Sequence, residues 1–177
     1  ETLSYAAVGE KAYRQTLTVN SVSKTYAMTG WRMGYAAGPV ELIDAMARIQ
    51  SQSTSGAPTF AQYALATALT ADQAAVEHMR AEFERRAHHM YRRLCAMPGF
   101  RCPKPTGAFY CFPNVSGAFG RFGVKGSVAV AERLLASALV AVVPGLAFGT
   151  DDHIRLSFAT SMELIDKGLD RIEALLR

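Results

Sequence analysis

A long helical pattern at residues 72–97 constrains the fold of this chain more than any other feature. Its sequence, DQAAVEHMRAEFERRAHHMYRRLCAM, is charged on one side and ends at Pro98 and Gly99. At 1.5 Å per residue such a helix is about 35–40 Å long, which is too long for one small core. The helix therefore predicts two lobes, with a boundary near residues 71–75, in a chain of 177 residues.

Strand and helix patterns alternate in two groups around this helix. The first group has strand patterns at 16–22 and 31–38, an amphipathic helix at 39–53, and an apolar, alanine-rich helix at 57–70 that we expect to be mostly buried. The second group has strands at 108–115, 139–145 and 153–160, and helices at 127–138 and 162–177. The alternation predicts an α/β fold with two domains, residues 1–74 and 75–177.

Composition excludes several classes of protein. Half of the residues are hydrophobic, the net charge is +4, and like charges form no long run, so we expect no nucleic-acid partner. No run of eighteen apolar residues predicts a membrane span. The three cysteines, Cys95, Cys102 and Cys111, match no zinc spacing. We therefore expect reduced thiols, no metal site and a cytoplasmic protein.

Lys24 stands directly after the strand pattern at 16–22, among hydroxyl groups and close to an arginine. Ser21, Ser23 and Thr25 surround it, and Arg32 follows. Burial or a neighbouring cation favours the neutral amine of a lysine, which can attack a carbonyl carbon. Arginine and hydroxyl groups together favour phosphate binding. A cofactor that carries both a carbonyl and a phosphate is pyridoxal phosphate.

Arg155 lies in the strand pattern HIRLSFAT. Ile154, Leu156 and Phe158 alternate with Arg155 along it. Because successive side chains of a strand point to opposite faces, Arg155 should point away from the apolar face. That register alone leaves open whether Arg155 simply faces water or binds a ligand.

The segment SVSKTYAMTGWRMGY, residues 21–35, resembles the lysine motif of the class I/II, fold type I, pyridoxal-phosphate-dependent aminotransferases, most closely the aspartate aminotransferase branch. Further landmarks of that family follow in the family's order: QSTSGAPTFAQ at 52–62, PTGAFYCFPNV at 105–115, VAVVPGLAFG at 140–149 and HIRLSFATS at 153–161. The resemblance therefore runs along the whole chain.

The resemblance implies a role for four residues. Lys24 would join the cofactor as a Schiff base and then move a proton between Cα of the amino acid and C4′ of the cofactor. Ser21 and Arg32 would hold the cofactor's phosphate, and Arg155 would pair with the α-carboxylate of the substrate. The family works as a homodimer, and Ser53 and Thr54 fall, by a looser match, where it places contacts to the partner subunit.

The resemblance also implies that this sequence is the C-terminal portion of an aminotransferase. It would comprise the end of the large pyridoxal-phosphate-binding domain, a three-layer α/β/α structure, and the small C-terminal α+β domain. The family's aspartate that holds the ring nitrogen of the cofactor would precede Glu1, which is not a methionine. We expect the parent to move an amino group between an amino acid, aspartate-like or aromatic, and a 2-oxo acid, and these 177 residues alone to be inactive.

Three alternatives remain open at this level. Ser21 and Lys24 match S-x-x-K of serine acyl-enzymes, but the partner motifs S-D-N and K-T-G are absent and Ser21 ends a strand pattern instead of starting a helix. The chain could be a non-catalytic dimerisation fragment, or a fold type I lyase, decarboxylase or acyl-CoA synthase. Other conspicuous residues have structural interpretations: we expect solvated side chains at His88 and His89, and packing at Tyr110 and Phe112.

Overall fold

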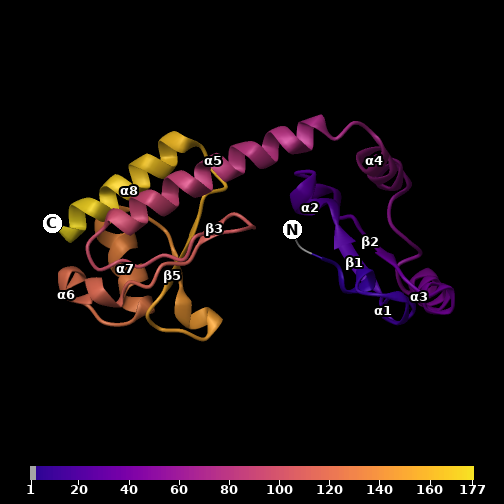
Figure 1. Ribbon diagram of the computed structural model, residues 1–177, viewed down its shortest axis with the longest axis horizontal. Helices are drawn as coiled ribbons and strands as arrows, with labels where there is room; N and C mark the ends of the chain where they lie inside the picture. Colours follow the sequence, from indigo (N-terminus) through magenta and orange to yellow (C-terminus); the bar gives the residue numbers. More distant parts are fainter. Residues whose placement is uncertain (1–2) are drawn as a thin grey trace. The chain divides into compact units, whose positions relative to one another are not determined.

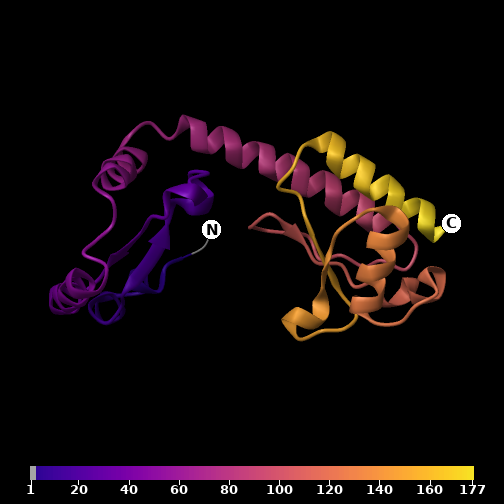
Figure 2. The same ribbon diagram turned by 180° about the vertical axis from the view of Figure 1, so that it is seen from behind.

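The computed structural model describes residues 3–177, which form two compact units (Figures 1 and 2). The first unit ends at Val76 and the second is Glu77–Arg177. The division falls two residues after the domain boundary predicted from the sequence. Among residues 3–177, no helix is both long and apolar enough to cross a membrane.

The first unit is built on a two-stranded antiparallel sheet. Strand β1 pairs with β2 from Thr18↔Ala37 to Ser21↔Gly34. At Gly34, a Cβ atom would lie 3.0 Å from the carbonyl oxygen of Asn20, so glycine permits this close pairing. The elements of the unit are η1 (Tyr5–Ala7), α1 (Glu10–Arg14), β1 (Thr18–Ser21), α2 (Val22–Thr25), η2 (Thr29–Trp31), β2 (Gly34–Ala37), α3 (Val40–Ser53) and α4 (Thr59–Thr70).

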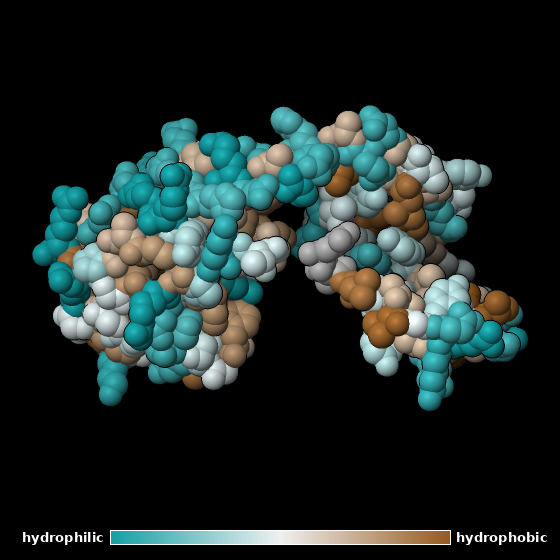
Figure 3. Space-filling view, viewed as in Figure 1, coloured by the Kyte–Doolittle hydropathy of each residue, from teal (hydrophilic) through white to brown (hydrophobic). Residues whose placement is uncertain are grey.

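Helix α4 differs from its prediction. We expected a mostly buried helix at 57–70, but within α4 only Ala61 is buried, while Phe60 and Tyr63 are about 69% and 74% exposed. The core of this unit is small and centres on Val22, Met33 and Ala61. A helix that is apolar on every side cannot be covered by so small a core, and Figure 3 shows apolar side chains gathered on the surface of this unit.

The second unit packs three long helices around a small antiparallel sheet of order β3-β5-β4. The observed strands are shorter than those predicted at 108–115, 139–145 and 153–160, whereas helix α7 has the predicted bounds. The elements are α5 (Ala74–Ala96), whose first turn begins in the first unit, β3 (Tyr110–Cys111), η3 (Ser116–Ala118), α6 (Phe119–Phe122), α7 (Ser127–Ala138), β4 (Val143–Pro144), η4 (Gly145–Phe148), β5 (Ile154–Ser157) and α8 (Met162–Leu176).

The core of the second unit lies between these helices and β5. Leu94 of α5, Leu134 of α7, Ile154 of β5 and Ile172 of α8 are all fully buried. Within α8 the buried residues recur at helical spacing, and within β5 Ile154 and Leu156 alternate with more exposed residues. The unit therefore has a hydrophobic core of its own.

Helices α5 and α8 lie side by side and are joined by polar contacts (Figures 1 and 2). His89 Nε2 lies 2.5 Å from Asp166 Oδ1, and Arg93 reaches Asp166 at 3.1 Å and Asp170 at 2.6 Å. The hydrogen bond from His89 holds the pKa of the Asp166 carboxyl below its usual range, and Arg93 adds to this effect. The prediction that His89 is solvated is therefore wrong, because α8 covers it, whereas His88 is exposed.

Candidate functional site

Strand β1 ends at Ser21, and the hydroxyl of this residue organises the turn that follows. Ser21 is the N-cap of α2, and its Oγ accepts the backbone N–H of Ser23 at 3.1 Å. The same hydroxyl lies 2.9 Å from Ser23 Oγ and 3.1 Å from the carbonyl oxygen of Met33. Ser21 thus links the end of β1 to the segment that leads into β2.

The position of Ser21 differs from the one expected from the sequence. Ser21 both ends a strand and starts a helix, so the position of Ser21 does not argue against the S-x-x-K interpretation. The absence of the S-D-N and K-T-G motifs still does.

Arg32 lies at the same end of the hairpin as Ser21. It has a left-handed backbone, with φ 54° and ψ 44°, which costs about 1–2 kcal/mol for a residue other than glycine. Its guanidinium donates one hydrogen bond, from Nη1 to the carbonyl oxygen of Thr29 at 2.7 Å. Because Ser21 pairs with Gly34, the strand register brings the Arg32 segment beside the Ser21 turn.

Lys24 stands in the last turn of the short helix α2, which Ser21 caps. The segment 18–37 that contains Ser21, Lys24 and Arg32 has hydroxyl, ammonium and guanidinium groups but no Asp or Glu. A ligand that fits such a set of groups is an anion, and a phosphate fits it best because arginine and hydroxyl groups both donate to phosphate oxygens.

Arg155 belongs to the second unit, on β5, and its register agrees with the prediction. Ile154 and Leu156 are buried on the core side, while Arg155 is half-buried on the other face. The guanidinium carbon of Arg155 lies 4.4 Å from the ring centroid of Tyr110 and 4.7 Å from that of Phe148. These distances are typical of cation–π contacts, which fix the plane of the guanidinium and stabilise its charge.

The sequence did not single out either aromatic partner of Arg155 as a site residue. Tyr110 was interpreted as packing, whereas the resemblance places LAFG, the segment that contains Phe148, close to the substrate. Their rings reach Arg155 because β3 and the segment after β4 flank β5 on its two sides. The alternation of Tyr110 and Phe112 around Cys111 was a signal that both rings lie on one face, opposite the buried side of Cys111.

A polar cluster follows directly along the chain from the Phe148 segment. Asp152 accepts hydrogen bonds from the Thr150 hydroxyl and from Asn114 Nδ2 at 2.6 Å, and its Oδ1 lies 2.6 Å from His153 Nδ1. The bonds from Thr150 and His153 lower the pKa of the Asp152 carboxyl to about 2. The His153 ring stacks on Phe112 at 4.9 Å.

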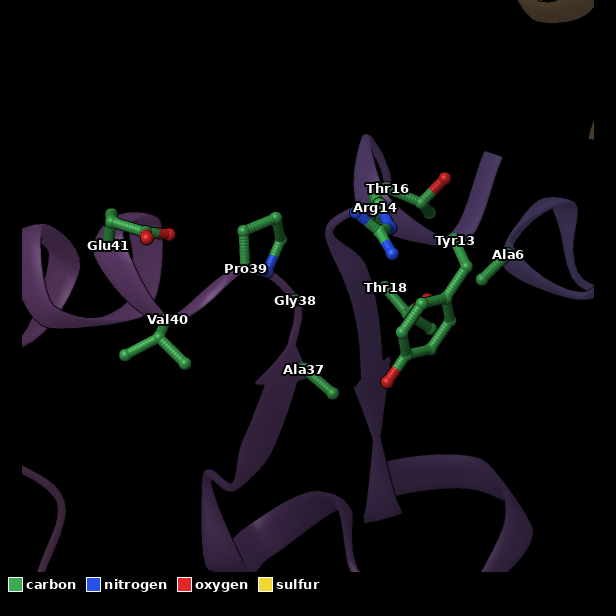
Figure 4. A pocket seen from close by; sticks show the side chains of 10 residues that line it. All are labelled: Ala6, Tyr13, Arg14, Thr16, Thr18, Ala37, Gly38, Pro39, Val40 and Glu41. Carbon is green, nitrogen blue, oxygen red and sulfur yellow. The ribbon is translucent and has the colours of Figure 1, made fainter. Parts of the chain in front are cut away.

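A cavity of about 430 Å³ lies at the other end of the β1–β2 hairpin, around Thr18, Ala37 and Gly38 (Figure 4). Arg14 lines this cavity and forms an ion pair with Glu10 at 2.7 Å. Ser21, Lys24 and Arg32 do not line it, so the cavity is separate from the candidate site.

No metal site emerges from residues 3–177, where no group of three or more His, Cys, Asp or Glu residues could hold an ion. All three cysteines are free thiols, with Cys111 buried and Cys95 exposed.

Comparison with known proteins decides the family. The profile of the family Aminotransferase class I and II matches residues 2–172. This chain belongs to that family. The aspartate aminotransferase of Bacillus sp. (strain YM-2) is 44% identical over 177 residues, which are 100% of this chain and 45% of that protein. The aspartate/prephenate aminotransferase of Cereibacter sphaeroides is 47% identical, over 92% of this chain and 42% of that protein.

Solved structures of class I/II relatives confirm the fold type I assignment. The aspartate aminotransferase of Rhizobium meliloti superposes with a TM-score of 0.85 at 42% identity, covering 94% of this chain and 43% of that one. The aromatic aminotransferase of Pyrococcus horikoshii gives a TM-score of 0.86 at 40% identity, covering 96% and 45%. This chain therefore spans less than half the length of these relatives.

Proposed function

We propose that the protein to which this chain belongs is a pyridoxal-phosphate-dependent aminotransferase, with Lys24 as the residue that carries the chemistry. The observation that supports this most strongly is the position of Lys24 in a turn that Ser21 caps, at the hairpin end shared with Arg32, in a chain of the class I/II family. The substrates would be an amino acid, aspartate-like or aromatic, and a 2-oxo acid, in keeping with the names of the relatives.

The groups at this hairpin end fit the cofactor. Ser21 and Arg32 would hold its phosphate, since a hydroxyl and a guanidinium both donate to phosphate oxygens and the segment 18–37 has no carboxylate to repel it. Pyridoxal phosphate, when bound, supplies an aldehyde that condenses with amines and a ring that accepts electrons from Cα of the substrate.

Lys24 would do two things at this end of the hairpin. Its Nζ would attach the cofactor between turnovers, which requires the neutral amine. The same Nζ, once free, would take the proton from Cα of the substrate and deliver it to C4′ of the cofactor. Both tasks need Nζ on a short, fixed element, and the Ser21 cap supplies one.

Arg155 would bind the α-carboxylate of the substrate. A guanidinium offers two parallel N–H donors that match the two carboxylate oxygens, and the rings of Tyr110 and Phe148 hold its plane. The proposal therefore assigns cofactor attachment and proton transfer to Lys24, and carboxylate binding to Arg155.

The assembly and the domain roles belong to the same proposal. Residues 1–74 would be the end of the large cofactor domain, and 75–177 the small domain. The parent would be a homodimer, with Ser53 and Thr54, both exposed at the end of α3, close to the partner subunit. A cytoplasmic location stays a prediction that rests on the free cysteines.

Reductive trapping tests this proposal. The protein is incubated with pyridoxal phosphate, reduced with borohydride, digested and mapped by mass spectrometry. We expect the pyridoxyl group on Lys24, and Lys24→Ala should abolish it. Lys11 and Lys104 serve as internal controls, since an adduct on either of them with Lys24 unmodified would contradict the assignment.

A further inference from the structure

Ser127, the first residue of α7, is the one polar or charged residue that is completely buried within residues 3–177. Its backbone N–H and its hydroxyl both donate to Asp151 Oδ1, at 2.9 and 2.8 Å. Its Oγ also accepts the backbone N–H of Leu146 at 3.1 Å. The hydroxyl thus uses its donor and an acceptor position at once.

The two groups of Ser127 serve different purposes. The N-cap of α7 is Gly126, which has no side chain, so Asp151 accepts the first N–H of the helix. The Ser127 hydroxyl ties α7 to η4, which contains Leu146, and to the turn at Asp151. Gly126 allows the carboxylate to come close, because a Cβ atom there would lie 2.8 Å from Asp151 Oδ2.

The segment that Ser127 holds is closed on itself. The N–H of Gly145 donates to the carbonyl of His153 at 2.8 Å, and the N–H of Thr150 donates to the carbonyl of Gly145 at 3.2 Å. A Cβ atom at Gly145 would lie 2.5 Å from the carbonyl oxygen of His153 and 2.5 Å from that of Thr150, so the turn requires glycine there. Backbone hydrogen bonds therefore join the two ends of the segment 145–153, and Ser127 attaches this segment to α7.

Phe148, at the end of η4, is the residue of this segment that contacts Arg155. Its ring is 49% exposed, so burial alone does not fix its position. It meets the Phe112 ring edge-on at 5.7 Å and covers the Arg155 guanidinium at 4.7 Å. The position of the ring over Arg155 therefore depends on how firmly η4 is held.

We propose that Ser127 is a positioning residue for the carboxylate site: through Leu146 and Asp151 it holds η4 so that Phe148 covers the Arg155 guanidinium. This inference rests on the proposed role of Arg155. Without the hydroxyl, the N–H of Leu146 loses its acceptor on α7 and only the backbone bond from Ser127 to Asp151 remains. Segment η4 is then held less firmly, the Phe148 ring covers the guanidinium less, and carboxylate binding weakens although no charge has changed.

Two measurements on the pyridoxal-phosphate-loaded protein test it. The first is the dissociation constant of the dicarboxylate maleate. The second is the NMR chemical shift of the Arg155 guanidinium protons, which are identified as the resonances that disappear in Arg155→Lys. Aromatic rings move the resonances of protons above them upfield. We expect Ser127→Ala to raise the dissociation constant about tenfold, the size of a lost cation–π contact, and to reduce the upfield shift. Cofactor content should not change.

Two variants serve as controls. Ser161→Ala removes a hydroxyl that accepts the N–H of Leu164 at the start of α8, so it should lower stability without changing either readout. Asp151→Asn keeps an acceptor oxygen for Ser127 and should remain close to wild type. If Ser127→Ala does not fold, Ser127→Cys, with a weaker donor and acceptor, takes its place with the same expectations.

Three outcomes would overturn the inference. The first is that Ser127→Ala folds, binds maleate within about twofold of wild type, and leaves the Arg155 chemical shift unchanged. The second is an equal effect in Ser161→Ala. The third is lost maleate affinity with an unchanged Arg155 shift. Should Arg155→Lys itself leave maleate binding unchanged, the proposed role of Arg155 fails, whereas the guanidinium shift still decides whether Ser127 positions it.

Discussion

At the scale of single residues, Arg155 offers the sharpest test of substrate binding. Arg155→Lys keeps the positive charge but loses the two parallel donors and the flat surface that Tyr110 and Phe148 cover. We expect binding of dicarboxylates to weaken by about 1.5–3 kcal/mol, the size of a hydrogen bond to a charged group, with cofactor content unchanged. Titration calorimetry measures this, and the matched control is Arg171→Lys, at a half-buried arginine of α8 that donates to the carbonyl oxygen of Leu139.

A second prediction at this scale concerns the stability of the fold in acid. Asp152 has a pKa of about 2 in the folded protein, against about 3.9 in an unfolded chain. A depressed pKa stabilises the fold above the unfolded value, and this contribution is lost as the pH falls from about 4 to 2. Asp152→Asn should therefore lower the melting temperature slightly at pH 7, because the carboxylate is partly exposed, and this difference should vanish near pH 2. Melts between pH 2 and 7 measure it, and a difference that persists at pH 2 would contradict it.

At the scale of elements, two neighbouring leucines of α7 show that the same residue type stabilises the fold to a different extent when it is buried and when it is exposed. Leu134 is fully buried against the core, whereas Leu135 is 56% exposed. Leu134→Ala should lower the free energy of unfolding by about 2–5 kcal/mol, and Leu135→Ala by less than about 0.5 kcal/mol. Urea unfolding followed by circular dichroism compares them, and equal losses would mean that α7 does not pack as described.

Helix α4 shows the opposite case, in which composition misled the prediction. Its sequence is as apolar as that of a core helix, yet its aromatic side chains Phe60 and Tyr63 are exposed. Hydrophobicity predicts that a segment tends to be covered, whereas the covering surface itself comes from other parts of a fold.

At the scale of the whole molecule, the exposed surface of the first unit predicts association. Val19, Ile49, Phe60 and Tyr63 are all about 69–74% exposed, and within residues 3–177 strands β1 and β2 pair only with each other. Apolar patches and unpaired strand edges favour contact with another copy. We therefore expect the 177-residue chain to form oligomers or aggregates in light scattering, and residues 77–177, which bury a core of their own, to remain monomeric.

Activity at this scale is a separate prediction. The residues of the proposed site are Lys24, Ser21, Arg32 and Arg155, and the segment 18–37 around the first three has no Asp or Glu that could hold the ring nitrogen of the cofactor. The 177 residues alone should give no turnover in a coupled aspartate–oxoglutarate assay. Measurable turnover would show that this chain needs no further acidic group, and a full-length relative serves as the positive control.

The sequence by itself determined the bounds of one helix, the register of one strand and the residues of the candidate site at the hairpin. Helix α7 has the predicted bounds, and β5 has the predicted register, because periods of 3.6 and 2 are properties of a short segment. Ser21, Lys24 and Arg32 could be found together for the same reason: they belong to one turn and one hairpin.

Only the tertiary structure decided the contacts between segments that are distant in the chain. It placed Tyr110 and Phe148 on Arg155, joined His89 to Asp166, and connected Ser127 to Leu146 and Asp151. No single segment encodes these contacts, since each requires two or three elements to be packed at a definite distance and angle. The same is true of exposure: α4 carries apolar side chains, but which of them are covered depends on the surfaces that surround it.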